Sequence, residues 1–159
     1  MCIMKEKLWI FILKFLVISL PLLALWLWRL QDQYLILLNH ILTFLLITLA
    51  GFNIQYFPAP FPIFINLIPY FSLMVITKGI RLKSRIIWLV VGLLILIGWH
   101  MVLTEAIYLV SLKYQIDSQQ YEKFTIPLFL FSETLPFLLW ILIARKQVEG
   151  LFFREKKAG

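Results

Sequence analysis

The stretch of sequence that decides the fold runs from Gln33 to Thr77 and reads QYLILLNHILTFLLITLAGFNIQYFPAPFPIFINLIPYFSLMVIT. None of these 45 residues is Asp, Glu, Lys or Arg. A helix of about 20 apolar residues already crosses the hydrocarbon core of a bilayer, which is about 30 Å thick. A water-soluble domain built from 159 residues cannot bury so long an uncharged stretch, so the sequence predicts helices that cross a membrane.

The rest of the chain has the same character. Hydrophobic residues make up 62% of it and the mean hydropathy is +0.93, whereas soluble domains are about 45–50% apolar. Five apolar segments have the length of helices and lack the strict alternation of barrel strands. We therefore expect an all-α, polytopic transmembrane helical bundle that forms one membrane domain over residues 1–159. The five expected segments are about 8–28, 34–51, 61–77, 86–112 and 126–144.

The connection between the second and third segments is rich in proline. Pro58, Pro60 and Pro62 stand at alternate positions and remove three amide donors, which forbids a regular helix there. The third segment has only about 17 residues and contains Pro69, so it is the weakest of the five as a membrane span.

The net charge of +7 is explained by topology rather than by nucleic-acid binding. The basic residues form no stripe interleaved with aromatic residues, and they stand between the apolar segments. Cytoplasmic loops carry an excess of Lys and Arg, so we expect a cytoplasmic C-terminus and anionic lipid headgroups as counterions. The residues that decide this orientation are Lys78, Arg81, Lys83 and Arg85 in one cluster and Arg145 and Lys146 in another.

The orientation of the N-terminus stays open. If all five segments cross, ten of the fifteen basic residues lie on the cytoplasmic side and the N-terminus lies outside. If the second or third segment fails to cross, the N-terminus moves inside and the distribution becomes twelve to three.

No motif in the chain is typical of an enzyme. The only cysteine is Cys2, which excludes an internal disulfide and a multi-cysteine metal site. His-Glu-x-x-His, Gly-x-Ser-x-Gly and paired intramembrane aspartates are all absent from the sequence. We expect no catalytic residue, no cofactor and no metal.

Polar residues inside the apolar segments are few, and an ionisable one near mid-bilayer costs about 2.5–3.5 kcal/mol. We expect His40 to bond a neighbouring helix, with a proton relay as the alternative.

His100 and Thr104 share a helix face, whereas Glu105 lies about 140° around the helix from His100. Glu105 is either an interfacial carboxylate or a buried functional one. The full set of candidates is His40, Asn66, His100, Thr104, Glu105 and Glu133.

Glu133 is the sharpest of these candidates. It lies within the fifth segment between Ser132 and Thr134, and Pro136 frees the backbone carbonyl of Ser132 from its helical bond. A carboxylate beside a loosened turn is suited to line a polar cavity. The alternative is an acid that is paired or protonated inside the bundle.

The last 95 or so residues resemble the membrane proteins that accompany exosortase H, within the exosortase and archaeosortase group. The resemblance is carried by Asn66-Leu-Ile-Pro-Tyr70 followed by Phe71-Ser-Leu-Met-Val-Ile, by Arg81-Leu-Lys-Ser-Arg85, by Ile97-Gly-Trp-His100 and by Leu135-Pro-Phe-Leu-Leu-Trp140. It implies an accessory component of a protein-sorting system in a bacterial cell inner membrane. Exosortases carry a catalytic Cys with Arg and His partners in their helices, and this chain offers only His100, so the resemblance implies no transpeptidase activity.

Three functions therefore stand as hypotheses. The first is a non-enzymatic accessory or assembly subunit, which contacts another membrane protein and uses Gly92 and Gly98 for close helix approach. The second is a small transporter or channel subunit with a polar path lined by His40, His100, Glu105 and Glu133. The third is a degenerate or unrecognised intramembrane hydrolase.

Overall fold

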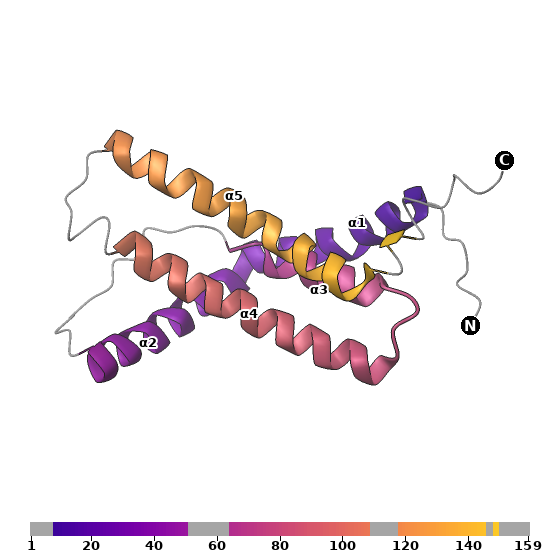
Figure 1. Cartoon of the computed structure of the whole chain (residues 1–159), viewed down its shortest axis with the longest axis horizontal. Coiled ribbons are helices and arrows are strands. Elements are labelled where there is room, and N and C mark those ends of the chain that lie inside the picture. The colour runs from indigo at the N-terminus through magenta and orange to yellow at the C-terminus, as the bar shows by residue number, and fades with distance from the viewer. Residues whose placement is uncertain (1–7, 51–63, 109–117, 146–147, 150–159) are drawn as a thin grey trace.

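The computed structural model describes residues 8–50, 64–108, 118–145 and 148–149, and this part of the chain is helical without any strand (Figure 1). The prediction of an all-α protein is therefore confirmed. The elements are α1 (Leu8–Leu25), the π-helical turn η1 (Trp26–Leu30), α2 (Gln31–Ala50), α3 (Leu67–Ile76), α4 (Leu82–Tyr108) and α5 (Ser118–Ile143).

The first two predicted segments, 8–28 and 34–51, are one continuous bent helix. The polar residues from Arg29 to Gln33 were predicted to separate them, but no Gly or Pro interrupts this part of the chain. Polarity alone does not break a helix, and the backbone continues through η1, where π-type hydrogen bonding accommodates the bend.

Within its described residues, 64–77, the third segment forms the ten-residue helix α3. Ten residues span about 15 Å, half of the hydrocarbon core. Pro69 lies in the first turn, where its missing amide would have no helical partner in any case. The helix ends at Thr77, whose backbone is extended, and Gly79 makes the following turn at a φ of 82°.

The last two helices are longer at their starts than predicted. The basic residues Lys83 and Arg85 already belong to the first turn of α4, and α5 begins at Ser118 rather than near residue 126. Charged side chains at a helix start extend away from the apolar face without ending the helix. The predicted end of the fourth segment and the prolines at 58, 60 and 62 lie outside the described residues.

Within the described residues, three helices are long and apolar enough to cross a membrane: Leu8–Phe44, Leu82–Ile107 and Thr125–Ile143. The expected number of five membrane segments is therefore too high for the described chain. Two segments merge into one helix, and α3 is too short to cross alone. The coarser prediction, a helical protein with the features of a membrane protein, is confirmed.

The short helix α3 lies at the centre of the bundle, in contact with α1, α4 and α5 (Figure 1). Its inward residues pack against Phe11 of α1, Leu96 of α4 and Trp140 of α5. A second apolar cluster joins α2 to α4 beside Phe64. The buried residues of α3 are Leu67, Ile68, Tyr70, Ser72, Leu73, Met74 and Ile76.

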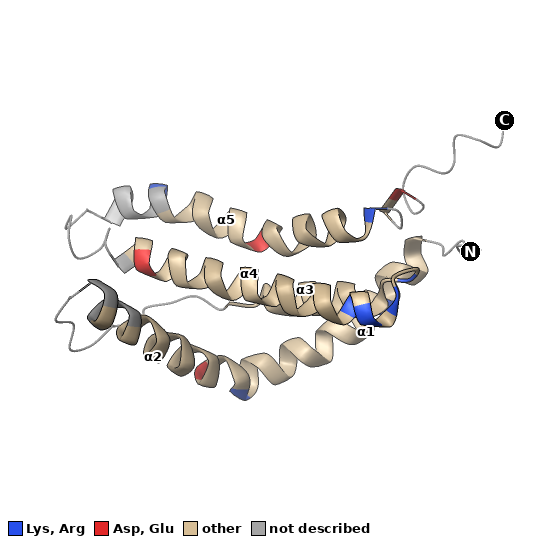
Figure 2. Ribbon diagram, turned by 60° about the horizontal axis from the view of Figure 1, so that its bottom comes forward, with Lys and Arg blue, Asp and Glu red and all other residues tan. Residues whose placement is uncertain are grey.

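One end of the bundle is basic. The start of α1, the end of α3, the start of α4 and the end of α5 all lie at this end (Figure 1). Most Lys and Arg of the described chain gather there (Figure 2). We call it the basic end. It includes Lys78, Arg81, Lys83, Arg85 and Arg145, whereas Lys146 lies outside the described residues.

Candidate functional site

A row of polar side chains crosses the middle of the bundle. The ring of His100 on α4 lies with its Nε2 atom 2.7 Å from Oδ1 of Asn66 and its Nδ1 atom 2.5 Å from the hydroxyl of Tyr34 on α2. Nδ2 of Asn66 donates to the hydroxyl and the backbone oxygen of Ser132 on α5, at 2.9 and 3.1 Å. We call these four residues the polar row.

The polar row has one consistent pattern of donors. The backbone oxygen of Ser132 can only accept, so the amide nitrogen of Asn66 faces it and the amide oxygen faces His100. Nε2 of His100 therefore carries a proton and donates, while Nδ1 accepts from Tyr34. The imidazole is neutral in this pattern, and each of its nitrogens has a partner.

Pro136 explains why Asn66 binds at Ser132. A proline has no amide hydrogen, so the carbonyl four residues earlier in the helix, that of Ser132, loses its helical partner. The side chain of Asn66 supplies the missing donor. The sequence predicted the free carbonyl correctly, but the group that uses it comes from the turn before α3 and not from Glu133.

The polar row is closed off by aromatic packing. Phe64 stacks on the His100 ring at a centroid distance of 4.1 Å and an interplanar angle of 23°. The Tyr34 ring meets the same imidazole edge-on at 5.7 Å. His100 and Asn66 are fully buried and Ser132 is 2% exposed, so their hydrogen bonds stand in a medium where an unmade bond is costly.

The polar row runs across the bundle, which suits it to joining helices rather than to forming a path along them. Its members come from α2, α4, the turn before α3, and α5, so the row runs across the helices rather than along them. Its bonds fix the start of α3 beside Ser132, the eighth of the nineteen residues of the Thr125–Ile143 span. This geometry ties four elements together at one level.

A second cluster holds the other end of α3. Nε1 of Trp140 donates to the Thr77 hydroxyl at 2.8 Å, and that hydroxyl lies 2.6 Å from the Leu73 carbonyl. Nη2 of Arg85 donates to the Thr77 carbonyl at 2.5 Å. A cation at the C-terminus of a helix bonds carbonyls that lack helical partners and favours the helix dipole. Arg85, predicted to set topology, thus also caps α3.

Gly92 gives α3 its close approach to α4. The Tyr70 hydroxyl donates to the Trp88 carbonyl at 2.6 Å, directly over Gly92. A Cβ atom at residue 92 would lie 2.0 Å from that hydroxyl oxygen. Gly98, by contrast, has no atom within 4 Å of the place where its Cβ would stand. Of the two glycines predicted to permit close packing, only Gly92 does so among the residues that the structure describes.

The remaining predicted site residues do not join the polar row. Thr104 is buried and donates to the carbonyl of His100, as their shared face predicted. His40 is exposed, and its Nδ1 lies 2.7 Å from the Ile36 carbonyl of its own helix rather than bonding a neighbouring one. Glu105 is half-buried near the end of α4, and Glu133 is exposed.

The path proposed for transport is therefore not assembled from the four residues predicted to line it. Of His40, His100, Glu105 and Glu133, only His100 lies in the polar row. The two nitrogens of His100 are bonded to Tyr34 and Asn66, so neither binds a glutamate. Within the described residues no three His, Cys, Asp or Glu side chains are grouped to hold a metal ion, and Cys2 lies outside them.

Sequence reasoning missed Tyr34 and Phe64, which were read as ordinary members of the second and third apolar segments. It noted Ser132 for the carbonyl that Pro136 frees, but it did not select Ser132 as a member of the site.

No family model, no curated protein and no solved structure matches this chain.

Proposed function

We propose that this protein is a non-enzymatic accessory subunit that binds a larger protein of the bacterial inner membrane through the outer face of α5. One observation carries the proposal, namely the exposed carboxylate of Glu133 at the centre of a candidate membrane span. We define the outer face of α5 by Glu133 and the exposed apolar residues in register with it, Leu130, Phe137 and Ile141.

Glu133 has no partner among the described residues of the chain. It is the ninth of the nineteen residues of the Thr125–Ile143 span, and it makes no hydrogen bond or ion pair with any described residue. Its neighbour Thr134 is also exposed, with its hydroxyl bonded back to the carbonyl of Phe131. The inward-facing Ser132 beside it is hydrogen-bonded to Asn66, and the outward-facing carboxylate is not bonded to any described residue.

A charge at the centre of a membrane helix costs about 2.5–3.5 kcal/mol on insertion scales. Such residues face a protein interior or a water-filled cavity and pair with another polar group. A partner helix with an Arg, Lys or hydroxyl donor at the same depth would satisfy the carboxylate, and Leu130, Phe137 and Ile141 would pack around the pair.

The charge distribution supports one orientation. The basic end collects Arg81, Lys83 and Arg85 at the start of α4 and Arg145 after α5. We assign this end to the cytoplasm, which places the C-terminus there as well. Since α1 also begins at this end, the N-terminus is assigned to the same side, the version with twelve basic residues inside (Figure 1).

The resemblance of the segments from Asn66 to Trp140 to exosortase H-associated proteins suggests the kind of partner. Exosortases carry Arg and His in their membrane helices, and such a side chain would satisfy the carboxylate of Glu133. This assignment rests on the resemblance alone.

The proposal is tested by purifying the tagged chain from its native membranes in mild detergent. We expect a stoichiometric complex with one larger membrane protein, and Glu133→Gln to reduce the recovered partner at least tenfold. Glu105→Gln is the matched control, because it removes the same charge near the end of α4, and the complex should persist. A wild-type chain that purifies alone, or a complex unaffected by Glu133→Gln, would contradict the proposal.

A transporter or channel subunit is the second candidate, and one observation favours it. Helix α3 begins inside the bundle beside buried polar groups, and interrupted helices of this kind form the substrate sites of many transporters. It predicts flux in liposomes containing the chain alone, with flux lost in His100→Phe. Liposomes without flux would remove it.

A further inference from the structure

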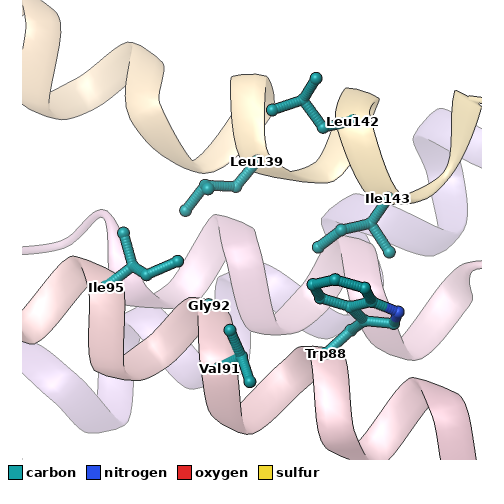
Figure 3. A pocket seen from close by; sticks show the side chains of 7 residues that line it. All are labelled: Trp88, Val91, Gly92, Ile95, Leu139, Leu142 and Ile143. Atoms are coloured by element: carbon teal, nitrogen blue, oxygen red, sulfur yellow. The ribbon is translucent and has the colours of Figure 1, made fainter.

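An apolar groove opens between α4 and α5 near the basic end. It has a volume of about 380 Å³ and is lined by Trp88, Val91, Gly92, Ile95, Leu139, Leu142 and Ile143 (Figure 3). Its lining contains no charged side chain. Ile95 and Leu139 lie toward one end of it, and Trp88 and Ile143 toward the other (Figure 3).

The groove is open to the side of the bundle and not to its interior. Trp88, Ile95 and Leu142 are 44%, 46% and 76% exposed, although they stand in candidate membrane spans. Gly92 forms the floor of the groove. Tyr70 of α3 packs directly against Gly92, and its hydroxyl donates to the Trp88 carbonyl. From Trp88 to Ile95 the groove follows α4 for about 10 Å, or two turns. A lipid tail is the apolar molecule present at this depth in a bilayer.

Basic side chains stand where the groove reaches the basic end. Arg81 immediately precedes α4 and Arg145 comes two residues after the end of α5, so both stand at the basic end, beyond the groove residues Trp88 and Ile143. Arg81 is exposed, and its side chain makes no hydrogen bond or ion pair with a described residue. Arg145 is exposed, and among the described residues its side chain bonds only Glu149, a surface pair that contributes little.

We propose that this groove binds one acyl chain of an anionic phospholipid, whose phosphate lies between Arg81 and Arg145. The apolar lining accepts the chain, and the two guanidinium groups select a negative headgroup over a zwitterionic one. The groove residue Leu142 lies on the opposite side of α5 from Glu133, about 180° around the helix. The lipid site is therefore independent of the proposed partner surface.

The proposal is tested by native mass spectrometry of the full chain released from nanodiscs. The nanodiscs contain equal amounts of phosphatidylglycerol and phosphatidylcholine with identical acyl chains. We expect one retained phosphatidylglycerol per chain, at least tenfold over phosphatidylcholine. Equal retention of the two lipids, or no retained lipid, would overturn the proposal.

Matched variants locate the site. Ile95→Trp fills the groove and should reduce the retained lipid at least tenfold, whereas Leu94→Trp places the same indole on an exposed position outside the groove and should leave retention unchanged. Both positions are exposed, so both variants should fold, and unfolding temperatures in detergent check this. Equal loss in both variants would overturn the assignment to the groove.

The headgroup contact is tested separately. Arg81→Gln combined with Arg145→Gln should remove the preference for phosphatidylglycerol, and Lys123→Gln, at the far end of α5, should not.

A photoreactive residue at Leu139 in native membranes distinguishes a lipid from a protein helix as the occupant of the groove. Attachment of lipid supports the proposal, and attachment of a protein chain instead would show that a partner helix occupies the groove and overturn it. Glu133→Gln should alter neither result.

Discussion

The inner and outer faces of α5 differ in whether their polar residues are bonded within the fold, as the adjacent residues Ser132 and Glu133 show. Ser132 is 2% exposed and receives two bonds from Asn66, one of them on the carbonyl that Pro136 leaves free. Glu133 is exposed and has no partner among the described residues. On the inner face, the polar groups of Ser132 are used in hydrogen bonds within the fold. On the outer face, the carboxylate of Glu133 remains for contact with another molecule.

Removing the central member of the polar row should have the largest effect. Asn66→Leu leaves the Ser132 carbonyl and the Nε2 proton of His100 without partners in a buried site. We expect a loss of about 2–4 kcal/mol in the free energy of unfolding, because each orphaned group costs about 1–3 kcal/mol. Unfolding by SDS titration in mixed micelles measures it. His40→Leu, at an exposed position, is the control, and an equal loss there would contradict the account.

Adding a methyl group where α3 packs against α4 should have the next largest effect on the free energy of unfolding. Gly92→Ala forces the Tyr70 ring away from the Trp88 carbonyl and should cost about 1–3 kcal/mol of unfolding free energy. Gly98→Ala adds the same methyl group in open space and should leave stability unchanged or slightly higher. The same SDS titration applies, and a similar loss in both variants would show that Gly92 is not a packing site.

The cap at the end of α3 should contribute less. Trp140→Phe keeps the ring packed against Phe11 but removes the donor to Thr77, for a loss of about 0.5–1.5 kcal/mol. A double-mutant cycle with Thr77→Val should be non-additive, because both changes remove the same hydrogen bond. Additive losses would mean that the bond adds nothing measurable.

The outer face should give the smallest effect on stability. Glu133→Leu breaks no internal bond, so the free energy of unfolding of the isolated chain in detergent should change by no more than about 0.5 kcal/mol. Measuring the free energy of unfolding of Glu133→Leu and of Asn66→Leu by the same SDS titration compares the two faces directly. A loss comparable to that of Asn66→Leu would place Glu133 inside the fold.

The helical class and most helix positions could be predicted because apolar length is a local property of the chain. The number of spans could not. The residues from Arg29 to Gln33 are polar, but nothing in them forbids a helix, and only the packing of the bundle decides that the helix continues. The weakness of the third segment was visible in its length and in Pro69.

The candidate site could be predicted only in part, because hydrogen-bond partners are set by tertiary contacts. Asn66 and His100 were correctly selected as polar residues in apolar surroundings. Pro136 correctly marked the free carbonyl of Ser132, but the sequence did not identify Asn66, 66 residues away, as its donor. Which of two adjacent residues, Ser132 or Glu133, faces inward depends on how α5 is rotated against α3.

Site-specific photocrosslinking in native membranes tests the central claim most directly. A photoreactive residue replaces either Phe137 on the outer face of α5, which is 42% exposed, or Val90 on α4, which is 50% exposed. The account predicts a discrete adduct with one other membrane protein from residue 137, lost when Glu133→Gln is added, and no adduct from residue 90. An adduct of equal yield from both positions, or one at residue 137 that survives Glu133→Gln, would contradict it, as would the absence of any adduct at residue 137.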